Sequence, residues 1–187
     1  AGLQIVEAGG LVTSMEEAIA AAEQLAAEPL DALVVFQSTF ADSTMIMALA
    51  ERIDAPLLMW AIPEARTGGR LRLNSLCGIN LGGHALTRTN HQFEYVYAPP
   101  DDEAAVEKVR LLARAGQVYR LLKHTRIGRA GENPDGFDSC LVNWDGLEQR
   151  FGVEVVQLEL NKVFDGVRAV EPDRVSAVAD DLGQRVA

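Results

Sequence analysis

The chain has 187 residues, 48% hydrophobic and 24% charged, which is typical of a folded globular protein of one or two domains. Its net charge of −10 argues against nucleic acid or an anionic membrane as main partners, because both are bound through clustered lysines and arginines. No apolar run reaches the roughly 18 residues that a membrane helix needs, and the two distant cysteines, Cys77 and Cys140, favour reduced thiols in a cytoplasmic protein.

The first hundred residues alternate between strand and helix patterns. A short apolar run at residues 3–7 predicts a strand that ends in a glycine turn. Thr13 and Glu16 have the spacing of a capping box and begin an alanine-rich helix that reaches residue 28. Further strand and helix patterns then alternate over residues 32–38, 43–53, 56–62, 74–86 and 93–99. This order predicts a parallel sheet with helices on both faces.

Residues 101–123 have the apolar spacing of a long amphipathic helix, with an acidic first turn and a basic last turn. Strand and helix patterns start afresh after it. We therefore expect a first α/β domain over residues 1–100 that lacks an initial strand and helix, a linking helix at 101–123, and the start of a second α/β domain at 124–187. The fold class is two Rossmann-like, flavodoxin-like parallel-sheet domains, the second incomplete.

Ligands of parallel sheets bind at the carboxyl ends of the strands, on the loops that lead into helices. One such loop contains Thr39 and Phe40, and the next contains Trp60 with charged residues such as Glu64 and Arg70. An aromatic ring with charged and amide groups suits a polyol, whose C–H faces stack on rings while its hydroxyls form hydrogen bonds. An ordinary solvated loop explains the same residues equally well.

Residues 74–86 have the length of a helix but contain three glycines, each of which costs roughly 1 kcal/mol in a helix relative to alanine. Asn74 or Ser75 can cap such a helix, and Asn80 and His84, four residues apart, share one polar face. The glycines either permit tight packing of the helix on its sheet or allow another backbone or a ligand to approach. These glycines, Gly78, Gly82 and Gly83, form a stripe without side chains along one side of the helix, the glycine stripe.

The sequence contains no compact cluster of Glu, Asp and His, no G-x-S-x-G motif and no other nucleophile beside a base. We therefore expect no catalytic residue and no metal ligand in this chain. The glycines between residues 128 and 136 match neither the dinucleotide nor the Walker spacing, which disfavours a nucleotide-binding protein.

Three segments, FQSTFADSTM, WAIPEARTGGRLRLNSLCGINLGGHAL and RIGRAGENPDGFDSC, resemble in order and spacing the amino-terminal portion of the L-fucose and L-arabinose isomerase superfamily. The similarity is greatest to fucose-isomerase-like proteins. The resemblance implies aldose–ketose isomerisation by an enzyme that uses a divalent metal, usually Mn²⁺, held by residues later in the chain. This chain would then bind no metal and be inactive alone, and would contribute substrate contacts and a subunit interface.

The resemblance also implies that Thr39, Phe40, Asn80 and His84 approach the sugar, in a homo-oligomer of three or six subunits whose first domain covers a neighbouring active site. With Trp60 and Asn74 they form the predicted set of sugar contacts. The glycine stripe would then allow close approach of subunits. The rival hypothesis is a free-standing carbohydrate-binding or regulatory module built from the same domains.

Overall fold

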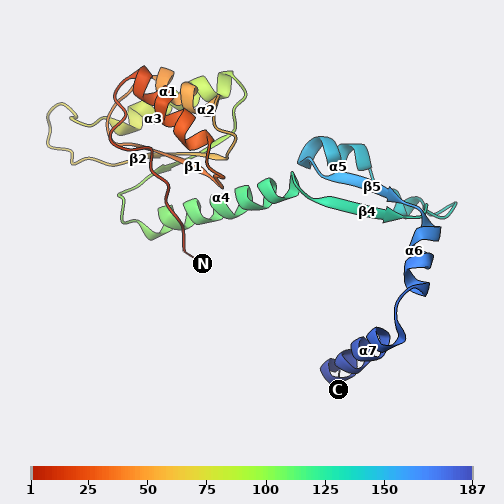
Figure 1. Cartoon of the computed structure of the whole chain (residues 1–187). Helices are drawn as coiled ribbons and strands as arrows, with labels where there is room; N and C mark the ends of the chain where they lie inside the picture. Colours follow the sequence, from red (N-terminus) through yellow and green to blue (C-terminus); the bar gives the residue numbers. More distant parts are fainter. Residues whose placement is uncertain (1, 187) are drawn as a thin grey trace. The chain divides into compact units, whose positions relative to one another are not determined.

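A computed structural model describes residues 2–186, which form two compact units, one up to Arg120 and one from Leu121 onward. Figure 1 labels their helices and strands. The elements of the first unit are α1 (Met15–Ala26), β1 (Leu33–Gln37), α2 (Ser43–Ala50), β2 (Leu57–Ala61), α3 (Ser75–Arg88), β3 (Phe93–Tyr97) and α4 (Glu103–Leu122), whose last two residues lie in the second unit.

The strands of the first unit form a parallel sheet in the order β1-β2-β3. Leu33 of β1 is in register with Leu57 of β2, which is in register with Phe93 of β3. Every residue of β2 is buried, because this central strand has a neighbour at each edge and helices over each face. Burial on both faces explains its continuous apolar sequence. A strand with one face in water would instead alternate apolar and polar residues.

Helices cover both faces of this sheet, as the alternating pattern predicted (Figure 1). Helices α1, α2 and α3 share one core cluster with the sheet, to which they contribute Leu25, Leu49 and Ile79. Helix α4 packs on the opposite face, where its Ala105 and Val109 join Leu58, Trp60 and Val96. Successive residues of β2 therefore belong to different clusters, as the alternation of side chains along a strand requires.

Two local predictions were wrong. Residues 3–7 form no strand, and β1 pairs only with β2 among the described residues. An apolar run has the propensity for a strand, but its backbone becomes one only beside a partner strand. The capping box of α1 lies one residue later than expected, with Ser14 as the cap and Glu17 as the partner that returns its hydrogen bond.

The glycines of α3 are buried inside the first unit. A Cβ atom at Gly82 would lie 3.2 Å from Cγ2 of Ile46, and one at Gly83 would lie 3.0 Å from Cζ of Phe93. At Gly78 it would meet the side-chain amide of Gln37 at 1.9 Å. The stripe therefore packs α3 on its own sheet and on α2, and the expectation that it serves the approach of another subunit was wrong.

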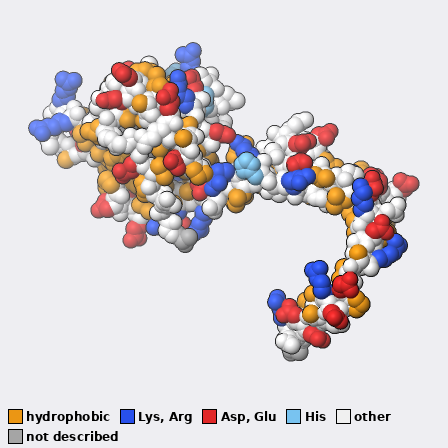
Figure 2. All heavy atoms as spheres, in the orientation of Figure 1, with side chains coloured by type: hydrophobic (Ala, Val, Ile, Leu, Met, Phe, Trp, Pro, Cys, Tyr) orange, Lys and Arg blue, Asp and Glu red, His pale blue; other side chains and the backbone are white. Residues whose placement is uncertain are grey.

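The second unit is a smaller parallel α/β element. Strands β4 (Arg126–Ala130) and β5 (Glu154–Leu158) pair in parallel, and between them in sequence lie the short 3-10 helix η1 (Asp138–Cys140) and helix α5 (Trp144–Phe151). Val153, just before β5, is fully buried. The later helices α6 (Leu160–Arg168) and α7 (Pro172–Val186) expose all their side chains through residue 185, including the apolar ones coloured orange in Figure 2.

The described residues thus contain two Rossmann-like parallel units, in agreement with the predicted fold class. None of the helices within residues 2–186 combines the length and apolar character that crossing a lipid bilayer demands.

Candidate functional site

Two loops that follow neighbouring strands meet at the carboxyl edge of the first sheet. The loop after β1 spans residues 38–42, and the loop after β2 spans residues 62–74. The backbone N–H of Phe40 donates a hydrogen bond of 2.7 Å to the carbonyl oxygen of Leu73. The edge that parallel-sheet topology marks for ligands is therefore where these loops come together.

Ser75 fixes the start of α3 against both strand ends. Its buried hydroxyl donates to the carbonyl oxygen of Gln37, the last residue of β1, and accepts a 3.0 Å hydrogen bond from the N–H of Ile62, just after β2. Asn74 precedes it in the left-handed conformation, with φ of 52°, and makes no side-chain cap. The predicted capping role of Asn74 was therefore wrong, and its amide is left available to the neighbouring cavity.

Glu64 holds the final part of the second loop. Its carboxylate accepts hydrogen bonds from the backbone N–H groups of Arg72 at 2.7 Å, Leu73 at 3.0 Å and Asn74 at 2.6 Å. These bonds, that from Asn74 foremost, lower the pKa of Glu64, and the charge of Arg72 adds to the effect. One carboxylate thus orders three consecutive residues.

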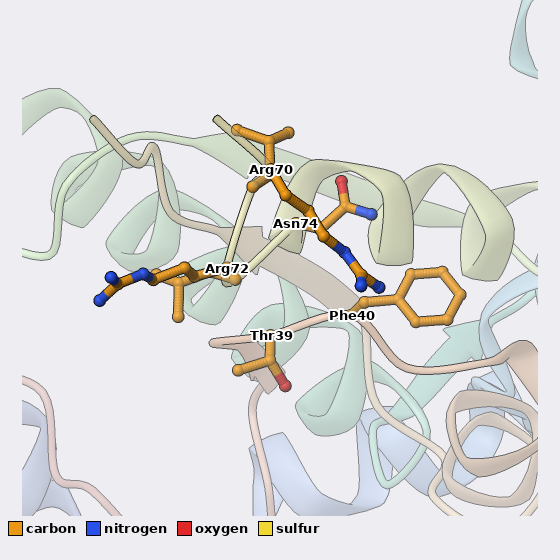
Figure 3. A pocket seen from close by; sticks show the side chains of 7 residues that line it. Thr39, Phe40, Arg70, Arg72 and Asn74 are labelled. Carbon is orange, nitrogen blue, oxygen red and sulfur yellow. The ribbon is translucent and has the colours of Figure 1, made fainter. Parts of the chain in front are cut away.

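A cavity of about 410 Å³ lies between the two loops. Its lining combines a hydroxyl, an aromatic ring, guanidinium groups and an amide, supplied by Thr39, Phe40, Arg70, Leu71, Arg72, Leu73 and Asn74. Figure 3 shows the guanidinium of Arg70 extending toward Phe40 and that of Arg72 extending the opposite way. The cavity offers polar groups of several kinds around one exposed ring, as a ligand site does.

The second loop is locally basic in an acidic chain. Residues 62–74 contain three arginines and one glutamate, a formal charge of +2, whereas the whole chain carries −10. Figure 2 shows blue basic side chains where this loop projects from the first unit. Neither Arg70 nor Arg72 forms an ion pair shorter than 4.0 Å with any residue that the structure describes.

The structure brings together three of the predicted sugar contacts, Thr39, Phe40 and Asn74, in this cavity. Arg70 and Arg72 also line it, although neither was among the predicted contacts. Arg70 lies in a loop that the sequence analysis named as a ligand-binding loop. Both arginines could have been predicted as contacts, because two basic residues close before a helix are unusual in this acidic chain.

The other predicted contacts lie elsewhere. Trp60 is only 7% exposed, stands on the sheet face covered by α4, and donates its indole N–H to the carbonyl oxygen of Ala98 at 2.9 Å. Its ring therefore belongs to the core, and a direct contact with a sugar at this cavity is ruled out by position. Asn80 and His84 are exposed on α3 and do not line the cavity.

Within residues 2–186 no three His, Cys, Asp or Glu side chains come close enough together to hold a metal ion. The side chains around the cavity are also unsuited to Mn²⁺, because guanidinium groups repel a cation and no carboxylate is among the residues that line it. The carboxylates of the two loops, Glu64 and Asp42, accept hydrogen bonds from backbone N–H groups. The described residues therefore do not fit the metal that the family resemblance implies.

Comparison with known proteins gives a consistent family match. Residues 2–123 match the model of the fucose/sulfoquinovose isomerase N-terminal domain. The chain is 32% identical to a sulfoquinovose isomerase of Alkalicoccus urumqiensis over 164 residues, 88% of this chain and 37% of that protein. It is 30% identical to the sulfoquinovose isomerase of Priestia aryabhattai over 154 residues, 82% of this chain and 34% of the relative. The chain thus spans about a third of the length of these relatives.

Proposed function

Because this chain belongs to the fucose/sulfoquinovose isomerase family as an amino-terminal portion, we propose that it supplies sugar-binding groups to an enzyme that interconverts an aldose and a ketose. The reaction moves a proton between adjacent carbons through an enediol, which requires an acid–base group or a metal at those carbons. We assign these catalytic groups and the Mn²⁺ ligands to parts of the enzyme outside residues 2–186. The described residues bind and orient the sugar.

The cavity between the loops after β1 and β2 is the observation that carries this proposal. Phe40 is 49% exposed there, although an aromatic ring of this size gains stability from burial. A sugar can cover such a ring with its C–H groups while Thr39 and Asn74 take hydrogen bonds from or give them to its hydroxyls. The cavity has the size range of small-molecule sites, about 300 to 1,000 Å³.

We further propose that the enzyme is a homo-oligomer, a trimer or hexamer, in which Asn80 and His84 of one subunit approach the sugar held by a neighbour. Both side chains are exposed on the same face of α3, and neither forms a hydrogen bond with another described residue. Their donors and acceptors are therefore free for a ligand or a second subunit. A cytoplasmic location completes the proposal, and the free thiols of Cys77 and Cys140 favour it.

The decisive experiment assays the complete protein with Mn²⁺ for ketose formation from sulfoquinovose and from L-fucose, followed by NMR. We expect one of these aldoses to be converted. Phe40→Ala should raise the KM for that sugar about fivefold, because it removes the stacking surface. Phe164→Ala is the matched control, since Phe164 is similarly exposed but lies in α6, and its KM should equal that of the wild type.

One result of this experiment would refute the proposal. If the complete protein with Mn²⁺ converts no aldose but binds a sugar without metal, the chain is a carbohydrate-binding module and the isomerase proposal is wrong.

A further inference from the structure

Strand β1 has a free edge on the side away from β2. The N–H of Leu33 donates to the carbonyl oxygen of Pro56 at 2.8 Å, and the backbone groups of successive residues point to opposite sides of a strand. The backbone groups of Val34 and Phe36 therefore point away from β2, and β1 has no neighbouring strand on that side within residues 2–186. Unpaired N–H and C=O groups along an edge are a template for a further strand.

The opposite edge of the sheet, on β3, is guarded by charge. The N–H of Ala98 bonds to the carbonyl oxygen of Ala61 at 3.1 Å, so the same alternation turns the backbone groups of Tyr95 outward. Lys108 donates to the outward carbonyl oxygen of Tyr95 at 3.1 Å and pairs with Glu94 at 2.7 Å. Lysine commonly protects an edge strand against further pairing, whereas β1, with the sequence LVVFQ, contains no charged residue. The sheet is thus open to extension at β1 and guarded at β3.

An apolar surface lies beside the free edge, on the face of the sheet where α4 packs. The rings of Phe36 and Trp60 are 6.0 Å apart between centroids, and Trp60 belongs to the cluster under α4. Val34 is nevertheless 37% exposed and Phe36 47% exposed. On the other face, Leu33 and Val35 pack in the core cluster that α1 and α2 share. The part of β1 that lacks a covering helix among the described residues is therefore on the α4 side.

We propose that polypeptide amino-terminal to residue 1 completes this sheet, as a parallel strand beside β1 followed by a helix that covers Val34 and Phe36. Helix α2 packs against both α1 and α3, so α1 is the end helix of its layer, on the β1 side. Gln24 of α1 donates to the carbonyl oxygen of Glu7 at 3.2 Å, which keeps the first described residues on this side. A segment that precedes them reaches the free edge without crossing the sheet. Only 37% of the Alkalicoccus urumqiensis relative is matched, so polypeptide outside the matched part is available.

The added strand has a consequence for the cavity. Parallel strands share one carboxyl edge, so this strand ends beside the loop that contains Thr39 and Phe40. The loop that follows it then forms a further wall of the cavity. The strand itself does not depend on the proposed function, because it is inferred from the sheet edge, and its tests need neither sugar nor metal.

The first test measures amide hydrogen exchange in the complete protein by NMR. The N–H groups of Val34 and Phe36 should exchange as slowly as that of Val35, which points to β2. Tyr95 is the internal control, because its N–H points outward from β3 and should exchange about a hundredfold faster than that of Val96. If Val34 and Phe36 exchange about a hundredfold faster than Val35, the edge is free in the complete protein and the proposed strand is wrong.

The second test measures thiol labelling and addresses the covering helix. Cys77 and Cys140 are both exposed and are first replaced by serine. In the complete, sugar-free protein, a maleimide should label Val34→Cys and Phe36→Cys about a hundredfold more slowly than Phe40→Cys. Phe40 is the matched control, since it is 49% exposed in the same unit and faces an open cavity. Equal labelling rates at the three positions would exclude a covering helix, and Val34→Cys, the smaller change, keeps the test valid if Phe36→Cys fails to fold.

Photochemical cross-linking identifies the occupant of the edge. A photoreactive p-benzoylphenylalanine in place of Phe36 should, on illumination of the complete protein, join to a peptide that precedes residue 1 in the same polypeptide. Mass spectrometry of the digested product locates that peptide. A cross-link between two polypeptide chains would assign the edge to a second copy, and cross-links found only to residues after the first would leave the edge without the proposed strand. Either result would overturn the inference and leave the isomerase assay untouched.

Discussion

Gly116 of α4 approaches the backbone of Asp31 so closely that a Cβ atom at position 116 would lie 1.8 Å from the Asp31 carbonyl oxygen. One turn further along α4, Arg120 donates two hydrogen bonds, of 3.0 and 2.8 Å, to the side chain of the same Asp31. The missing side chain at position 116 therefore determines how closely α4 approaches the segment that leads into β1.

Gly116→Ala should destabilise the first unit by about 2 kcal/mol, because a backbone atom cannot move aside as a side chain can. The sign of the change in unfolding free energy distinguishes this close contact from a helix effect. Replacing glycine by alanine inside a helix ordinarily stabilises a protein by about 0.5 to 1 kcal/mol. Gly166→Ala in α6 is the matched control, because nothing lies within 4 Å of the new Cβ. Urea unfolding followed by circular dichroism measures both, and equal shifts in the two variants would contradict the packing described for Gly116.

Gly82→Ala should destabilise the protein by about 1 kcal/mol, because the new methyl group meets Ile46 at 3.2 Å and Met59 at 3.4 Å. Unfolding in urea gives the change in stability, and light scattering gives the mass of the protein particle in solution. We expect lower stability with an unchanged mass. The reverse result, unchanged stability with a smaller mass, would indicate that the glycines contact a neighbouring subunit.

The order of the second loop should depend on pH through Glu64. Hydrogen bonding lowers the folded-state pKa of this carboxyl below its ordinary value of 4.5, with the N–H of Asn74 as the largest cause. A lowered folded-state pKa means that the stabilisation is complete above pH 4.5 and is lost as the pH falls through the lowered value. Amide hydrogen exchange at Leu73 and Asn74 should therefore accelerate in acid beyond the intrinsic trend.

Glu64→Gln should produce the same acceleration at neutral pH, since a neutral amide is a weaker acceptor for three N–H groups than a carboxylate. Sugar affinity should fall with it. Glu23→Gln is the control, because Glu23 is exposed on α1 and distant in sequence from the loop. Exchange rates at Leu73 that do not respond to Glu64→Gln would show that another interaction orders the loop.

Trp60 and Phe40 should respond in opposite ways to substitution. Trp60→Phe removes the indole N–H that Ala98 accepts and should destabilise the first unit by about 1 kcal/mol without changing sugar affinity. Phe40→Leu should weaken sugar binding with little loss of stability, because Phe40 is half exposed. Thermal melts and calorimetric titrations on the two variants separate a core aromatic residue from a binding one.

His84→Ala should leave stability unchanged, since His84 is exposed and makes no hydrogen bond with the described residues. Under the proposed oligomer it should lower turnover or sugar affinity, because the imidazole faces a neighbouring subunit's sugar. Steady-state kinetics of the complete protein measure the effect. Kinetic constants equal to those of the wild type would remove His84 from the site.

The regular elements of the first unit could be predicted because each leaves a pattern in its own residues. The continuous apolar run of β2 indicated a strand buried on both faces, and Ala105 and Val109 marked the buried side of α4. The run at residues 3–7 has comparable local character but forms no strand, since pairing depends on a neighbour that its own residues do not specify.

The candidate site was only partly predictable for the same reason. Topology indicated which loops would meet, and Thr39, Phe40 and Asn74 lie in them. Trp60 has a side chain equally suited to a sugar, but it points to the other face of the sheet, toward α4. Which of two aromatic residues is exposed depends on packing by distant elements.

The sequence by itself determined the alternation of strands and helices and the parallel sheet, because propensity and hydrophobic periodicity are properties of local segments. It also indicated the family, through the resemblance of three of its segments to known members. Only the tertiary structure decided that the α3 glycines serve internal packing, that Glu64 orders its loop, and that the Arg70 side chain stands at the cavity with no ion pair to any residue the structure describes. Each of these depends on distances between side chains and backbone groups that only the folded chain brings into contact.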